Sequence, residues 1–153
     1  MNSISGGNSP CNIEIFTLTN NVTFGNLKTA ILQFRKQAKN WTKTLNTTDL
    51  SYTITVRILN DQVMQLEKIF ITEHGLPLQN QTNHVILAKK GVINNHGKAS
   101  FPGIVNLLED LIQFPSDQDR NEWPKWEDLR RHVTKIYVMI IQATSHLKPH
   151  QII

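Results

Sequence analysis

The sequence predicts an α+β fold, in which a mostly antiparallel sheet of about four or five strands packs against two or three helices. Short β-branched or alternating segments at residues 13–19, 51–59 and 85–90 indicate strands, whereas residues 27–45 and 104–114 have helical spacing of apolar residues. The length of 153 residues fits a single domain with one hydrophobic core.

The composition indicates a basic globular protein. We expect residues 12–147 to form the domain, with a flexible tail at 1–11 and a second tail at 148–153. Sixteen Lys and Arg against twelve Asp and Glu give a net charge of +4. No apolar run is long enough to span a membrane, and the first residues lack the pattern of a signal peptide, so we expect a protein that is not secreted. Cys11 is the only cysteine, which excludes an intramolecular disulfide.

The first half of the domain is predicted to contain three strands and one helix. Residues 13–19 are rich in Ile, Phe and Thr, which favours a strand. Residues 27–45 form the predicted helix, with Asn26 as its N-cap. Apolar and polar residues alternate over 51–59, and 66–72 is its expected partner strand.

The second half is predicted to contain strand 85–90, helix 104–114 and a helix over 125–132. Residues 133–144 fit two interpretations, because their β-branched side chains favour a strand while their apolar spacing also fits a helix. We predict that the last helix passes into a strand near Lys135.

The predicted helix 27–45 carries an apolar stripe beside a basic stripe, and it contains no Asp or Glu. We define the basic stripe as Lys28, Leu32, Arg35, Lys36, Lys39 and Lys43, in which Leu32 is the single apolar member. Such a face is either ordinary solvated surface or a binding site for a polyanion, namely an anionic lipid surface or nucleic-acid phosphates. The exposed Leu32 favours a lipid surface. Trp41 falls on the apolar side of the helix and is expected in the core.

Candidate catalytic residues are isolated in this sequence. His146 and His150 have a spacing that could suit a metal, but Pro149 breaks the helix that would align them. His74 and His96 would act as catalysts only if the fold brought them together with a carboxylate. There is no phosphate-binding glycine loop and no hydrolase motif. We therefore expect a protein that is not an enzyme, with no metal, no cofactor and no small-molecule substrate.

Several segments carry a resemblance to a known family. The predicted strand 13–19 and the turn at 23–26 are followed by the first helix. Residues 95–102 form a basic and aromatic stretch that ends in proline. The predicted helix at 126–133 leads into the β-branched segment 136–141. In this order the elements resemble the matrix proteins of rhabdoviruses. That resemblance implies a single matrix-like domain.

The resemblance and the basic stripe together predict a non-enzymatic viral matrix-like structural protein. Such a protein would bind an anionic membrane surface and the nucleocapsid, and would self-associate into a homo-oligomer during virion assembly. Its expected locations are the virion, the host cytoplasm and inner membrane surface, and alternatively the nucleus. The second hypothesis is a small basic RNA-binding viral accessory protein that uses the same residues.

Overall fold

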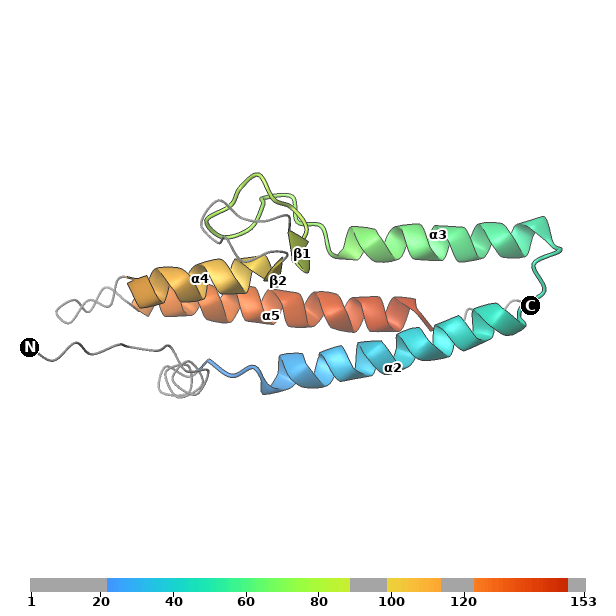
Figure 1. Ribbon diagram of the computed structural model, residues 1–153, viewed down its shortest axis with the longest axis horizontal. Coiled ribbons are helices and arrows are strands. Elements are labelled where there is room, and N and C mark those ends of the chain that lie inside the picture. Colours follow the sequence, from blue (N-terminus) through green and yellow to red (C-terminus); the bar gives the residue numbers. More distant parts are fainter. Residues whose placement is uncertain (1–21, 89–98, 114–122, 149–153) are drawn as a thin grey trace, which may run out of the picture.

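The computed structural model describes residues 22–88, 99–113 and 123–148, and over these residues the protein is mostly helical (Figure 1). Its helices are α2 (Gly25–Thr47), α3 (Thr53–Ile69), α4 (Pro102–Gln113) and α5 (Trp123–His146). Within the described residues the only sheet is an antiparallel pair of two-residue strands, β1 (Leu87–Ala88) and β2 (Ala99–Ser100). The predicted α+β fold with four or five strands is therefore wrong.

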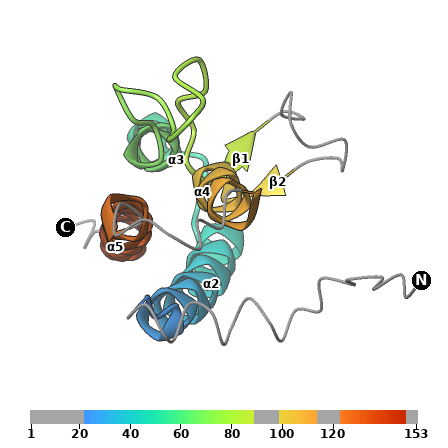
Figure 2. The ribbon, with the colours of Figure 1, turned by 90° about the vertical axis from the view of Figure 1, so that its left-hand side faces the viewer.

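Helix α5 is the centre of the arrangement, because it contacts α2, α3 and α4. Helix α4 lies along the first half of α5, whereas α2 and α3 extend past the other end of α5 (Figure 1). In the view along the helices, α3 lies at the top of the molecule and α2 at the bottom, and α4 and α5 lie between them (Figure 2). The described part of the chain is thus an elongated helical unit.

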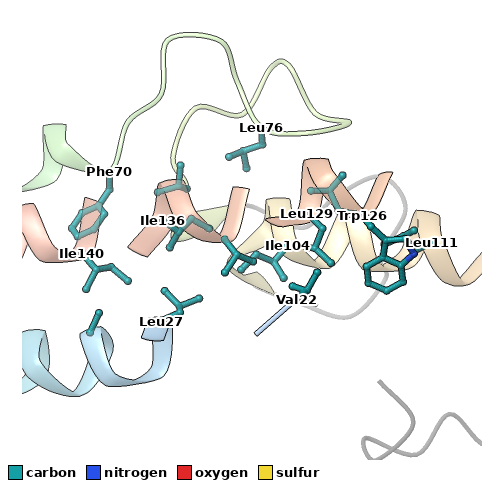
Figure 3. Packing of buried hydrophobic residues seen from close by; sticks show 14 of the residues in the cluster. Val22, Leu27, Phe70, Leu76, Ile104, Leu111, Trp126, Leu129, Ile136 and Ile140 are labelled. Atoms are coloured by element: carbon teal, nitrogen blue, oxygen red, sulfur yellow. The ribbon is translucent and has the colours of Figure 1, made fainter. Parts of the chain in front are cut away.

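The core follows one face of α5. Its buried residues recur at spacings of three and four, as a helix that contacts neighbours along its whole length requires. They are Leu129, Val133, Ile136, Ile140 and Ala143, and each is at most 6% exposed. Figure 3 shows Leu129, Ile136 and Ile140 along α5, with Phe70 beside Ile140 at one end and Leu111 and Trp126 at the other. The same row corrects the prediction for 133–144, which is helix throughout and not a strand after Lys135. Burial along one face prevailed over the β-branched composition.

The predicted strand 51–59 is wrong, because α3 begins at Thr53 and includes the rest of this segment. The prediction rested on alternating apolar and polar residues over a short segment. In the structure the positions that face inward repeat with helical period, and they are Thr55, Gln62, Leu66 and Ile69. The predicted partner strand 66–72 is likewise wrong, because α3 continues to Ile69. Only Ile71 makes an isolated antiparallel bridge, with His84.

The two helices predicted from amphipathic spacing at 27–45 and 104–114 are confirmed as α2 and α4. The predicted N-cap Asn26 is wrong, since α2 begins at Gly25 and the backbone N–H of Gly25 donates to Oγ1 of Thr23. Of the predicted strand 85–90, the two residues of β1 are extended and paired. The predicted strand 13–19 and the tail 1–11 lie outside the described residues, as does 148–153 beyond Lys148.

A buried amide joins three helices at the C-terminal end of α5. Gln62 of α3 accepts a hydrogen bond from the indole Nε1 of Trp41 in α2 at 2.9 Å, and its Nε2 donates to the carbonyls of His146 and Lys148 at 2.6 and 3.3 Å. Gln37 of α2 donates to the carbonyl of Leu147 at 3.1 Å. Carbonyls at the end of a helix lack partners within the helix, and here side chains of two neighbouring helices supply them.

Candidate protein-interaction surfaces

The structure places the whole basic stripe on the exposed side of α2. Lys28, Leu32, Arg35, Lys36, Lys39 and Lys43 are all exposed. Ion pairs between described residues involve other groups, namely Lys125 with Asp110, and Arg130 and Arg131 with Glu127. The positive charge of α2 is therefore uncompensated within the described part of the chain.

Trp41 is half-buried and faces α3, as its hydrogen bond to Gln62 shows, so it is not part of the buried core in which the sequence predicts it. The apolar side of α2 that was predicted to be buried does pack inward, with Leu27 and Ala30 fully buried and Ile31 and Phe34 partly buried against the core. The two faces of this helix thus lie as the sequence pattern predicts.

An apolar groove lies between α2 and α3, and we call it the α2–α3 groove. Ile31 and Phe34 of α2 form one wall, and Val63 and Leu66 of α3 form the other. Ile140 of α5 lines the groove between them. The groove has a volume of about 410 Å³.

Aromatic rings and the β1 region complete the α2–α3 groove. Phe34 and Phe70 meet edge to face with ring centroids 6.1 Å apart, and Phe70 stacks on His84 with centroids 6.2 Å apart. Figure 3 shows Phe70 and Ile140 next to each other at this end of the core. Leu87 and Phe101 line the groove beside the short sheet. The groove is built from five separate segments of the chain, namely α2, α3 with Phe70, residues 84–87, Phe101 and α5.

Two residues that line the groove are exposed apolar side chains, and others occur near the start of α3 and next to Val63. Val63 is 46% exposed and Leu87 is 58% exposed, although both line the groove. Further exposed apolar residues are Tyr52, Ile54 and Met64. An apolar surface of this kind is typical of a site that binds another protein surface.

The candidate catalytic residues are not brought together. His74 is exposed, while His96 and His150 lie outside the described residues. His146 contacts the backbone carbonyl of Gln62 at 3.0 Å. Over the described ranges no group of three or more His, Cys, Asp or Glu side chains is close enough to hold a metal ion. Within the same ranges, none of the helices has the length and apolar character needed to cross a membrane.

One titratable group that the sequence analysis did not single out is buried, namely His132 of α5. It is 7% exposed and lies against Gly103 in the first turn of α4, where a Cβ atom would overlap the imidazole ring. Its Nε2 has no hydrogen-bond partner. Burial, and secondly the positive charge of Lys135, lowers the pKa of His132 to about 4. The ring is therefore neutral at pH 7 and serves packing between α4 and α5.

The helical fold, the open apolar groove and the charged face of α2 define the class of the protein as a helical interaction domain. The model of one family, described as the transferrin receptor-like dimerisation domain, matches residues 22–148. The chain belongs to this family.

Two curated relatives are longer proteins. The chain is 25% identical over 140 residues to Aminopeptidase NAALADL1 of Rattus norvegicus, which covers 90% of this chain and 18% of the relative. It is 25% identical over 131 residues to Aminopeptidase NAALADL1 of Mus musculus, which covers 84% of this chain and 16% of the relative. The chain therefore spans less than a fifth of the length of each of these relatives.

These findings correct the predicted identity and function. The resemblance to rhabdovirus matrix proteins is wrong, because residues 22–148 match a different family. The viral matrix function and the viral RNA-binding alternative are wrong for the same reason, and nothing supports membrane, nucleocapsid or RNA partners. Membership of a dimerisation-domain family does support the expected homo-oligomer. A binding role of the basic stripe and the cellular location stay predictions.

Sequence reasoning missed the α2–α3 groove and His132. The groove depends on α3 being a helix, and this segment had been interpreted as two strands. The apolar residues Leu59, Leu66 and Ile69 of α3 keep helical spacing, but the inward positions Thr55 and Gln62 are polar, so hydropathy alone gives only part of the helical pattern. His132 carried no such signal, because its burial depends on the glycine of another helix.

Proposed function

We propose that this chain is a dimerisation module that joins two copies of a longer aminopeptidase-like protein. The observation that carries this proposal is the family match over residues 22–148. The relatives support the second part, because both are named as aminopeptidases and each is more than five times longer than the matched region.

The surface of the domain supports association with another protein. Large apolar side chains of α3, of β1 and of the residue before α3 are in contact with water, which is costly for a domain that stays alone. Interfaces between identical subunits bury surfaces of this kind and are more apolar than the remaining surface. The exposed side chains in question are Tyr52, Ile54, Val63, Met64 and Leu87.

Sedimentation equilibrium of the purified chain over a concentration series tests dimerisation. We expect the weight-average mass to rise with concentration to twice the 17.5 kDa of one chain. A mass that stays at one chain up to about 100 μM, a weak association on the usual scale of affinities, would contradict the proposal.

We also propose that the domain contributes assembly and not catalysis. Its candidate acids and bases within the described residues do not converge, and the one buried histidine faces a glycine. Incubation of the chain with aminoacyl-p-nitroanilides should release no more nitroaniline than buffer does. Release of nitroaniline that scales with the concentration of this chain and is abolished in a His74→Asn variant would show that the domain itself is catalytic.

A further inference from the structure

The α2–α3 groove has the size and the lining of a small-molecule site. Its volume is about 410 Å³, and cavities that hold small molecules in proteins usually measure about 300 to 1000 Å³. The described residues that line it are all apolar except Glu67 of α3 and His84. A ligand that fits this lining has an apolar body and very few polar groups, which the two polar side chains would bind.

Phe101 contributes an aromatic ring to the groove from a strained backbone conformation. Its φ is 57°, in the left-handed region that bulky residues rarely adopt. The backbone N–H of Phe101 donates to the carbonyl of Ile86 at 2.9 Å, and its carbonyl accepts from the N–H of Ile104 at 3.0 Å. These bonds hold the residue in place at the groove. Backbone strain of this kind is concentrated at ligand-binding sites and other functional sites.

His84 presents a hydrogen-bond donor, because its tautomer is fixed by the backbone. The N–H groups of Ile86 and Leu87 both donate to its Nδ1, each at 3.2 Å. A nitrogen that accepts these bonds carries no hydrogen, so the neutral ring carries its hydrogen on Nε2. Within the described residues Nε2 has no acceptor of its own. The ring lines the groove and therefore offers an N–H to an acceptor atom of a ligand.

Glu67 gives the groove a negative charge. Its side chain is exposed and belongs to none of the ion pairs between described residues. No Lys or Arg of the described ranges lines the groove. A carboxylate attracts an ammonium group and repels an anion, and the faces of nearby aromatic rings also attract cations. The charge of the groove is therefore complementary to a cationic ligand.

We propose that the α2–α3 groove binds a small apolar amine that carries a carbonyl oxygen next to its ammonium group. Glu67 accepts hydrogen bonds from the ammonium group, and Nε2–H of His84 donates to the carbonyl oxygen. The apolar body of the ligand lies against Phe70 and Ile140, which are neighbours in the core (Figure 3). Such binding goes beyond dimerisation and does not depend on it, because every residue named belongs to one chain.

Three related compounds test the chemistry of the ligand. L-Phenylalaninamide has both polar groups, 3-phenylpropanamide lacks only the amino group, and 2-phenylethylamine lacks only the carboxamide. We expect a dissociation constant of about 1 mM or lower for L-phenylalaninamide, and values at least about tenfold higher for the other two. Methyl signals of Ile31, Val63 and Leu66 should shift on titration in NMR spectra of the full chain, because these residues line the groove.

Two variants of α3 test the role of Glu67. Glu67→Gln should raise the dissociation constant of L-phenylalaninamide at least about tenfold and leave that of 3-phenylpropanamide unchanged. Asp61→Asn is the matched control, because it removes the same charge from an exposed position of the same helix outside the groove. It should leave both dissociation constants unchanged. Both positions are exposed, so the fold is retained, and circular dichroism of each variant verifies this.

Several outcomes would overturn the proposed site. Equal affinities for L-phenylalaninamide and 3-phenylpropanamide, or equal effects of Glu67→Gln and Asp61→Asn, would exclude recognition of the ammonium group by Glu67. A nitrogen-15 NMR spectrum that places the hydrogen of neutral His84 on Nδ1 would exclude its role as a donor. No shift of the groove methyl signals up to about 10 mM ligand, a very weak association, would overturn binding itself. Sedimentation equilibrium without ligand measures dimerisation separately, so either proposal can fail alone.

Discussion

Acidification should destabilise the protein through His132. Burial holds the pKa of this side chain at about 4, against an ordinary value of 6.5. At intermediate pH the unfolded chain therefore binds a proton that the folded chain does not bind. The stability linked to this residue is complete above about pH 6.5, decreases as the pH falls and reaches its full loss near pH 4.

The size of the effect follows from the two pKa values. One pKa unit corresponds to about 1.4 kcal/mol. The difference between 6.5 and about 4 gives a loss of about 3 kcal/mol in the free energy of unfolding between pH 7 and pH 4. For a domain of this size, such a loss lowers Tm by roughly 6 to 12 °C.

Thermal unfolding followed by circular dichroism at constant ionic strength measures this contribution. Other groups also titrate, so the relevant quantity is the difference between the wild type and His132→Leu, whose side chain has a similar volume and carries no titratable group. We expect Tm of the wild type to fall more steeply than Tm of His132→Leu. His74→Asn, which removes an exposed histidine, should follow the wild type. Parallel curves for the wild type and His132→Leu would refute the reasoning.

The remaining predictions concern stability, measured by urea unfolding at pH 7. Gly75→Ala should cost about 2 kcal/mol or more, because Gly75 has a φ of 73° and a Cβ there would collide with backbone, whereas Gly25→Ala should cost little, because its Cβ would make only an ordinary contact with Oγ1 of Thr23 at 3.5 Å. Gln62→Leu should cost about 2 to 3 kcal/mol by leaving its hydrogen-bond partners unpaired, and a cost below about 0.5 kcal/mol would contradict this role. Ile136→Ala should cost about 2 to 5 kcal/mol, and Val138→Ala, at an exposed position of the same helix, far less.

The parts of the fold that were predictable are the helices whose two faces differ strongly. The sequence of α2 contains no acidic residue, and its basic and apolar residues lie in two separate stripes. In α4 the apolar residues occupy one side of the helix. Both patterns are local, so the sequence alone indicates a helix and its buried face. The exposure of the basic stripe follows from the same pattern.

The parts that were missed depend on contacts between distant segments. The β-branched residues of α5, such as Val133 and Ile136, suit a strand or a helix equally, and burial along α5 decides between them. In α3 the inward positions include Thr55 and Gln62, whose burial no hydropathy pattern indicates. The α2–α3 groove was beyond reach for the same reason, because it exists only when α2, α3 and α5 are packed together.

The hydrogen bonds of Gln62 have a consequence for the axial alignment of the helices. Apolar surfaces alone allow neighbouring helices to pack in more than one register, displaced by a turn. A buried amide that must meet the indole of Trp41 and the carbonyl of His146 together is satisfied in one register only. The same alignment sets Phe34 of α2 against Phe70, which follows α3, so the buried side chain of Gln62 contributes to the register in which the two walls of the α2–α3 groove meet.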